Sequence, residues 1–233
     1  MHISAIIAAG GQGRRMNSSI SKQFLNLKGH PILYYTLNKF ERMDQIDSIV
    51  LVTSAADIQY VQEMIINRYK FKKTQIVGGG KERQDSVYNG LRKLSPQTDI
   101  VVIHDGVRPF VTKQIIENSI AAAVEHKAVG VAVPVKDTIK VVDRDNIIKS
   151  TPDRSTLWAM QTPQTFRYDI IMNAYEKAMS EGYYGTDDTV LVERLGFPVK
   201  IIDGAYENIK ITTPEDIIIA EAFISLGYGH YGR

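Results

Sequence analysis

The sequence predicts an α/β fold with a mostly parallel β-sheet covered by helices, and two observations support this. Short apolar, β-branched runs alternate with longer amphipathic stretches along nearly all of the 233 residues. Apolar residues make up 44% of the chain and charged residues 23%, the proportions of a chain that can bury a substantial core. Because no linker, repeat or low-complexity tract divides it, we expect one domain over residues 1–233.

The strands are expected where short apolar runs are rich in β-branched residues, and the helices where longer stretches have helical spacing. The expected strands, in chain order, are residues 3–8, 48–53, 74–77, 100–104, 130–135 and 199–202. The expected helices are residues 31–42, 57–69, 82–94, 113–126, 168–179 and 214–226.

Two of these helices are preceded by capping sequences. Ser54 is followed three residues later by Asp57, and Thr213 by Asp216, with Pro214 at the first helical position. In a capping box such side chains bond to backbone amides that the first helical turn leaves without partners. We therefore expect helices to begin directly after Ser54 and Thr213.

The alternation of strands and helices breaks between residues 137 and 162. Residues 138–142 and 147–151 are two β runs joined by the polar turn Asp-Arg-Asp-Asn. This pattern predicts a β-hairpin inserted into the α/β domain. Exposed hairpin edges need a partner, which could be a second copy of the protein or the hairpin's own domain.

Composition excludes several classes of protein. Lys and Arg total 28 against 26 Asp and Glu, so the net charge is only +2 and gives no strong field for DNA or a membrane surface. The single tryptophan and the dispersed tyrosines form no stacking platform for a nucleic acid. The absence of cysteine excludes disulfides, thiolate nucleophiles and cysteine-ligated metal sites. The apolar run at residues 1–9 is too short to span a bilayer, so we expect a cytoplasmic protein.

A glycine-rich segment follows the first expected strand, with the sequence Ala-Ala-Gly-Gly-Gln-Gly-Arg-Arg-Met at residues 8–16. Backbone amides at such a strand end can approach a phosphate closely. Met16 stands where the dinucleotide fingerprint needs Gly or Ala, and the Gly-Lys-Ser/Thr of a P-loop is absent. The cations of Arg15 and Lys22 favour a phosphate-binding loop over a plain tight turn.

Two further segments are expected at the same edge of the sheet. Gly78, Gly79 and Gly80 follow the third expected strand, and Asp105 follows the fourth. The carboxyl ends of parallel strands form the edge where α/β proteins bind ligands. Carboxylates, waters and phosphate oxygens usually hold Mg²⁺, so Asp105 is the expected Mg²⁺ ligand. The alternative is that Asp105 caps a helix or forms a turn before Pro109.

A series of segments, in order and spacing, resembles the 2-C-methyl-D-erythritol 4-phosphate cytidylyltransferase family of non-mevalonate isoprenoid synthesis. The segments are residues 9–16, 22–23, 83–87, 104–110, 134–138, 151–154, 161–164, 186–188 and 208–212. Ribitol-5-phosphate cytidylyltransferases share the glycine loop, the His-Asp-x-x-Arg-Pro-Phe stretch and Gln-Thr-Pro-Gln. Residues 134–140 and 151–158 look more like the methylerythritol branch.

The resemblance implies a Rossmann-like, doubly wound sheet that binds CTP and Mg²⁺ at its carboxyl edge. It also implies a homodimer in which a β-arm, at about 137–162, reaches into the neighbouring active site. The implied reaction joins CTP and 2-C-methyl-D-erythritol 4-phosphate to give 4-diphosphocytidyl-2-C-methyl-D-erythritol and pyrophosphate. The same fold could instead act on ribitol 5-phosphate, or bind CTP as a regulatory protein that has lost the chemistry.

The resemblance also assigns residues by matching position. Arg15 and Lys22 would stabilise charge on the α-phosphate, while Lys210 and Arg154 would hold the acceptor phosphate, Arg154 from the second subunit. The acceptor-binding set further contains Arg108, Thr138 and Thr162. The CTP-binding set is Ala9, Gly10, Gly11, Gly13, Gly80 and Ser86.

The implied chemistry agrees with what the sequence lacks. A phosphate monoester has its second pKa near ~6, so it is mostly a dianion at neutral pH and needs no protein base. The sequence offers no Ser-His-Asp array, no cysteine and no histidine pair with metal-ligand spacing. A reaction that depends on positioning and charge neutralisation requires none of these.

Overall fold

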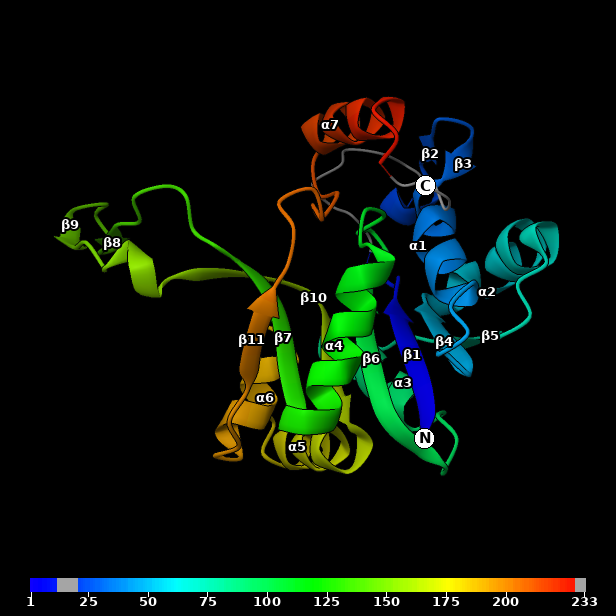
Figure 1. The fold of residues 1–233 in the computed structure, drawn as a ribbon, viewed down its shortest axis with the longest axis horizontal. Helices are drawn as coiled ribbons and strands as arrows, with labels where there is room; N and C mark the ends of the chain where they lie inside the picture. Colours follow the sequence, from blue (N-terminus) through cyan, green and yellow to red (C-terminus); the bar gives the residue numbers. More distant parts are fainter. Residues whose placement is uncertain (12–20, 229–233) are drawn as a thin grey trace.

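The described residues, 1–11 and 21–228 of a computed structural model, contain one large mixed β-sheet. Its seven strands lie in the order β11-β7-β10-β6-β1-β4-β5 across the described part of the chain (Figure 1). Their bounds are β1 His2–Ala8, β4 Ser48–Thr53, β5 Thr74–Gly78, β6 Thr98–Asp105, β7 Ala128–Pro134, β10 Trp158–Arg167 and β11 Lys200–Asp203. Only β10 runs antiparallel to its neighbours in this described sheet. The predicted α/β class and mostly parallel sheet are confirmed.

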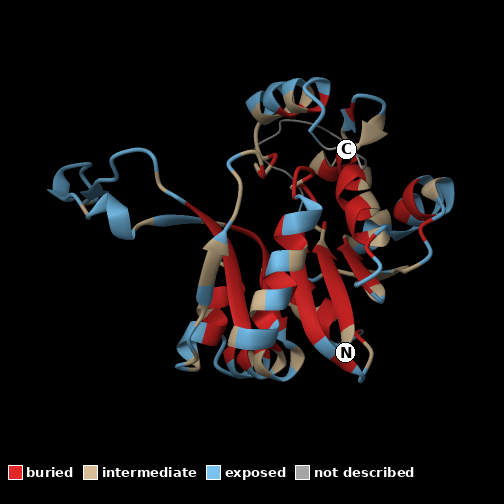
Figure 2. Cartoon of the chain, in the orientation of Figure 1, coloured by how far each residue is buried: buried red, intermediate tan, exposed pale blue. Residues whose placement is uncertain are grey.

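Helices cover both faces of the sheet. They are α1 Ile32–Glu41, α2 Ile58–Val61, α3 Arg83–Leu91, α4 Lys113–His126, α5 Tyr168–Ser180, α6 Thr189–Arg194 and α7 Pro214–Ser225. Along β1, Ile3, Ala5 and Ile7 join the cluster that contains residues of α1 and α4, whereas Ile6 joins the cluster of α3 and α5. This alternation follows from the two-residue period of a strand. Because both faces are packed, the central strands are buried along most of their length (Figure 2).

The strand order places the winding reversal at β1. From β1 the chain first builds outward through β4 and β5, then crosses back to β6 on the other side of β1. The loops that follow β1 and β6 therefore diverge at the carboxyl edge, and such a switch point leaves a crevice for a ligand. A smaller apolar cluster, formed by residues such as Leu27, Phe110 and Ile224, packs α7 beside this edge.

The strand β10 and the helix α6 were not predicted from the sequence. Apolar periodicity does not mark β10 because Gln161, Thr162, Gln164 and Thr165 are buried polar residues. Each of these side chains forms hydrogen bonds to neighbouring elements, which makes their burial tolerable. The start of α6 depends on the same strand, since the side-chain oxygen of Gln164 accepts from the backbone N–H groups that open the helix.

The two predicted capping sequences have different outcomes. Thr213 and Asp216 form the expected capping box, with Pro214 in the first turn of α7. Ser54 instead accepts a hydrogen bond from Ala56 N at 3.3 Å and caps a short 3₁₀ segment, Ala55–Asp57. The stretch predicted as a single helix over 57–69 is divided into this segment, α2, and a π-helical turn at Gln62–Asn67.

The inserted hairpin is present and projects from the body of the molecule (Figure 1). Its strands, β8 Val141–Val142 and β9 Ile148–Ser150, pair antiparallel in a sheet separate from the large one. A second small pair, β2 Asn26–Leu27 and β3 His30–Pro31, lies before α1. The insertion expected at 137–162 is too long, because β10 begins at Trp158 and pairs with β7 from there. We call residues 135–157 the arm.

None of the helices in the described part of the chain has the length and apolarity needed to cross a lipid bilayer.

The junction of β6 and β10 contains a buried histidine with one defined tautomer. His104 Nε2 lies 3.2 Å from the carbonyl oxygen of Arg108, so this nitrogen carries the proton. Thr162 Oγ1 accepts from the N–H of Asp105 at 3.1 Å and donates to His104 Nδ1 at 3.0 Å. Burial lowers the pKa of His104 to about 3, and the hydrogen bond to the Arg108 carbonyl and the charge of Asp105 oppose it only partly. His104 is therefore neutral near pH 7.

We expect His104 to make the fold sensitive to acid. Below pH ~6.5 the unfolded chain binds a proton at this histidine that the folded chain does not bind until about pH 3, so stability falls as pH falls. Between pH 7 and pH 5 the free energy of unfolding of the wild type should fall by about 2 kcal/mol more than that of His104→Gln. Urea denaturation at both pH values measures the difference. Parallel pH dependences would contradict it.

Gly90 allows α3 to lie close to the sheet. A Cβ at this position would lie 3.0 Å from Val52 Cγ2 and 3.1 Å from Ile6 Cγ2, and both side chains are fully buried. Alanine normally favours a helix over glycine by about 1 kcal/mol. We expect the opposite sign here, with Gly90→Ala lowering the free energy of unfolding by about 1–3 kcal/mol because the core must shift. A denaturation midpoint equal to or above that of the wild type would refute this explanation.

Candidate active site

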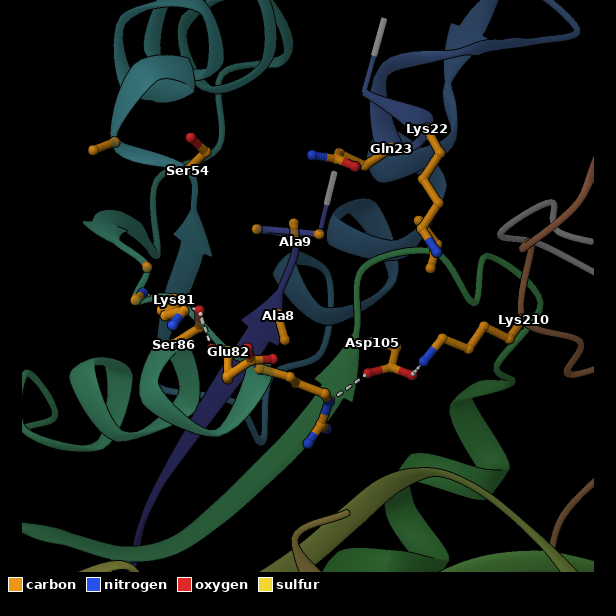
Figure 3. A pocket seen from close by; sticks show the side chains of 17 residues that line it. Ala8, Ala9, Lys22, Gln23, Ser54, Lys81, Glu82, Ser86, Asp105 and Lys210 are labelled. Carbon is orange, nitrogen blue, oxygen red and sulfur yellow. Dashed lines mark hydrogen bonds and ion pairs between the residues drawn. The ribbon is translucent and has the colours of Figure 1, made fainter. Parts of the chain in front are cut away.

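A pocket of about 700 Å³ opens at the carboxyl edge of the sheet, among the loops that follow β1, β4, β5 and β6. This volume is typical of sites for small ligands. Backbone of the glycine segments forms part of its wall, and four basic residues against two acidic ones line its described part. The basic residues are Lys22, Lys81, Arg83 and Lys210, and Figure 3 shows that Lys22 and Lys210 come from different parts of the chain.

The second glycine turn is shaped by Ser86. Its hydroxyl accepts from Gly80 N at 3.1 Å and donates to the carbonyl oxygen of Glu82 at 3.0 Å. A Cβ on Gly79 would lie 2.8 Å from Ser86 Oγ, so the turn requires a residue without a side chain. A capping box between Glu82 and Asp85 then begins α3, whose amino terminus lies at the pocket. That terminus contributes positive potential toward a bound anion.

Asp105 is the buried anion of the site. Its Oδ1 accepts from Arg83 Nε at 3.2 Å, and its Oδ2 lies 2.7 Å from Lys210 Nζ, a contact drawn in Figure 3. Arg108 Nε lies 3.8 Å from the same Oδ2. Although burial opposes ionisation, Arg83, Lys210 and Arg108 together hold the pKa of Asp105 far below its usual range. Asp105 is therefore a carboxylate at any pH at which the protein works.

Arg108 lies beside this cluster and is mostly buried. Its Nη1 donates to the carbonyl oxygen of Asn208 at 2.7 Å, so it ties β6 to the loop that carries Lys210. Burial lowers the pKa of Arg108, while Asp105 raises it. Its Nε has no hydrogen-bond partner within the described residues.

The residues expected to bind CTP fall together where the structure describes them. Ala9, Gly10, Gly11, Gly80 and Ser86 all line the pocket, with Lys22, Lys210 and Asp105. Arg15 and Gly13 lie outside the described residues.

The residues expected to bind the acceptor are more dispersed. Thr162 is buried, and its hydroxyl is used between His104 and Asp105 rather than at the pocket wall of the described chain. Thr138 and Arg154 lie exposed on the arm, where Arg154 Nη1 donates to the carbonyl oxygen of Lys136 at 2.7 Å. Neither of them lines the pocket in the described part of the chain.

Four further residues line the pocket that were not predicted as site residues, namely Gln23, Ser54, Lys81 and Arg83. Arg83 had a usable signal, since it is the first basic residue of the helix that follows the second glycine cluster. Gln23 is buried, and its Nε2 lacks a hydrogen-bond partner among the described residues.

The donor set allows one specific kind of metal binding. No group of three or more acidic or histidine side chains in the described residues could hold a metal by itself. Each oxygen of Asp105 already contacts a basic side chain. Mg²⁺ can be bound through a single carboxylate when phosphate oxygens and waters complete its coordination. The residues therefore fit a metal that arrives with a phosphorylated ligand, with Asp105 as a single donor.

Comparison with known proteins gives one consistent family. A sequence model described as 2-C-methyl-D-erythritol 4-phosphate cytidylyltransferase matches residues 3–226. Proteins of that name from Caldanaerobacter subterraneus subsp. tengcongensis and Clostridioides difficile are 52% and 53% identical over 225 and 223 residues. These alignments cover 96% of this chain in both cases, and 99% and 94% of the relatives.

Solved structures agree with the sequence comparison. The 4-diphosphocytidyl-2C-methyl-D-erythritol synthase of Anaerococcus prevotii superposes with a TM-score of 0.86 at 38% identity, covering 96% of both chains. The 2-C-methyl-D-erythritol 4-phosphate cytidylyltransferase of Francisella tularensis gives 0.82 at 28% identity, covering 95% of this chain and 99% of that one. The chain therefore belongs to the 2-C-methyl-D-erythritol 4-phosphate cytidylyltransferase family of enzymes.

Proposed function

We propose that this enzyme transfers the cytidylyl group of CTP to 2-C-methyl-D-erythritol 4-phosphate and releases pyrophosphate. The observation that supports it most directly is the glycine-walled pocket with Lys22, Lys81, Arg83 and Lys210 around it, at the switch point of the sheet. The relatives that are 52% and 53% identical to this chain are named for methylerythritol phosphate, which favours it over ribitol 5-phosphate as the acceptor. The absence of cysteine suits a reaction carried out in the reducing cytoplasm.

The reaction requires charge neutralisation more than proton transfer. An oxygen of the acceptor phosphate attacks the α-phosphorus of CTP, and the bond from that phosphorus to the oxygen bridging to the β-phosphorus breaks as pyrophosphate leaves. The acceptor phosphate is mostly a dianion at neutral pH and is already a nucleophile. His104 suits this view, since both of its ring nitrogens are used in internal hydrogen bonds and its pKa is about 3.

Lys22 and Lys210 take different parts in this proposal. Lys22 follows the glycine loop, near where the α-phosphate would lie, and with Arg15 it would stabilise the charge that develops there. Lys210 reaches the pocket from the loop before α7 and would hold the acceptor phosphate close to the nucleotide. An ammonium group is a compact, movable charge that suits this purpose.

We infer that Mg²⁺ takes part, with Asp105 as its single protein donor. The ion would neutralise negative charge on the triphosphate. A separate ligand cluster is not needed because triphosphate oxygens and waters can supply the remaining positions.

We also infer that the arm completes the site of a second subunit. The apolar side chains of Val141, Val142, Ile147 and Ile148 on the arm are about half exposed, which is costly unless another surface covers them. Arg154 and Thr138 lie on the same arm, away from the pocket of their own chain. Pairing two copies around a twofold axis would bury the apolar residues and bring Arg154 to the partner's acceptor phosphate.

Pyrophosphate release with CTP and Mg²⁺ tests the proposed reaction. With 2-C-methyl-D-erythritol 4-phosphate as acceptor we expect a kcat/KM at least about tenfold above that with ribitol 5-phosphate, because the acceptor's methyl and hydroxyl groups must be discriminated. Faster release with ribitol 5-phosphate would support the polyol alternative. Binding of CTP without turnover with either acceptor would support a regulatory protein.

Mixing two inactive variants tests the crossing of the arm. Lys22→Ala should lower kcat by ~100-fold to ~1000-fold with little change in thermal stability, and Arg154→Ala should also be inactive. If Arg154 acts in the partner's site, each heterodimer contains one intact site, and full subunit exchange should restore about a quarter of wild-type activity. If Arg154 acts in its own subunit, both heterodimer sites carry a defect. Exchange proved by mass without recovered activity would overturn the arrangement.

A further inference from the structure

We propose that Asp188 is a positioning residue for the reaction, acting through Arg83 and Asp105 on Lys210. The inference rests on the proposed function, in which Lys210 holds the acceptor phosphate. Asp188 itself lies behind the pocket wall and does not line the pocket of the described chain. Alternating charges connect it to the site, since Asp188 pairs with Arg83, Arg83 with Asp105, and Asp105 with Lys210.

The contact between Asp188 and Arg83 fixes the orientation of a guanidinium group. Arg83 Nη1 and Nη2 each donate to one carboxylate oxygen of Asp188 at 2.8 Å. Two parallel hydrogen bonds define both the plane and the direction of the guanidinium. The side chain of Asp188 is fully buried, so little water competes for its oxygens.

The orientation of Arg83 then decides where its third donor points. With Nη1 and Nη2 used by Asp188, Nε donates to Asp105 Oδ1 at 3.2 Å. Arg83 therefore holds two carboxylates in one rigid, planar arrangement. A lysine would retain the charge at this position but could not reproduce the fork.

Asp105, held by Arg83, in turn fixes the position of Lys210 in the pocket. Its second oxygen lies 2.7 Å from Lys210 Nζ, whose side chain is about one-third exposed in the pocket. A flexible lysine side chain in a pocket can adopt many rotamers, and a fixed carboxylate selects among them. The position of the ammonium group thus depends on a carboxylate that depends on Arg83.

Asp188, the residue of this series farthest from the pocket, is itself held by buried side chains of the core. Tyr175 on α5 donates to Asp188 Oδ1, and the backbone N–H of Asp188 donates to Gln164 Oε1 on β10 at 3.0 Å. Tyr175 and Gln164 are both buried. Starting the six-residue helix α6 does not require the side chain of Asp188 to bond to both Arg83 and Tyr175. These additional contacts favour a role beyond helix formation.

The first test compares Asp188→Asn with a structural control on the same helix. We expect Asp188→Asn to lower kcat/KM for the acceptor by about tenfold or more, while the KM for CTP stays within about threefold of the wild type. Arg83→Lys should lower kcat/KM for the acceptor to a similar extent. Val192→Ala, which opens a cavity in α6 away from the pocket, should lower Tm while leaving both kinetic constants near wild type.

A double variant separates positioning from general destabilisation. If Asp188 acts through Arg83, Asp188→Asn should reduce kcat/KM little further in a chain that already carries Arg83→Lys. If the two substitutions acted independently, their fold-losses in kcat/KM would instead multiply. A multiplicative loss, or an Asp188→Asn enzyme with wild-type constants, would overturn the inference.

A chemical readout keeps the inference separate from the proposed reaction. Acylation of lysine amines by an activated acetate ester, followed by peptide mass spectrometry, reports on Lys210 without any turnover. With the exposed Lys70 as internal reference, Lys210 should react about threefold faster in Asp188→Asn than in the wild type, because its carboxylate partner is no longer fixed. An unchanged rate would count against the inference even if the wild type is active. If the wild type makes no product, the proposed function is refuted. The acylation rate of Lys210 still tests whether Asp188 positions it through Arg83 and Asp105.

Discussion

The buried carboxylate of Asp105 sets the main electrostatic constraint on this molecule. An ion removed from water at the end of β6 is stable only if opposite charges and hydrogen bonds replace its hydration. Arg83 comes from α3, Arg108 from the turn after β6, and Lys210 from the loop before α7. Distant parts of the chain therefore meet at one point, and their meeting concentrates positive charge at the pocket despite a net charge of only +2.

Features with a local signal could be predicted from the sequence. The apolar, β-branched run of β4 was predicted with the bounds that the structure gives, and the amphipathic α4 likewise. Burial on both faces makes such strands uniformly apolar, and one-sided burial gives a helix its stripe. The glycine segments were also predictable as pocket walls, because only glycine satisfies the close approach seen at Gly79.

Features that depend on long-range polar contacts could not be predicted in this way. The strand β10 looks polar because Gln161, Thr162 and Gln164 enter the interior, where their partners come from elsewhere in the chain. Asp188 lies 105 positions from Arg83, and nothing in its neighbourhood identifies that partner. Burying such polar groups costs little free energy only when their hydrogen-bond partners are present. Those partners come from distant parts of the chain, so no local sequence pattern reveals them.

The polar character that conceals β10 also organises the site. Gln164 anchors the backbone at Asp188, from which the contact to Arg83 begins. On the opposite side, Gln161 donates to the carbonyl oxygen of Ala205, and Asn208 donates to that of Thr162, which fixes the loop that carries Lys210. An apolar strand would pack equally well against β6 and β7 but would leave both of these segments unattached. The buried polar side chains of β10 therefore contribute specificity of position. Both ends of the path from Asp188 to Lys210 depend on this one antiparallel strand.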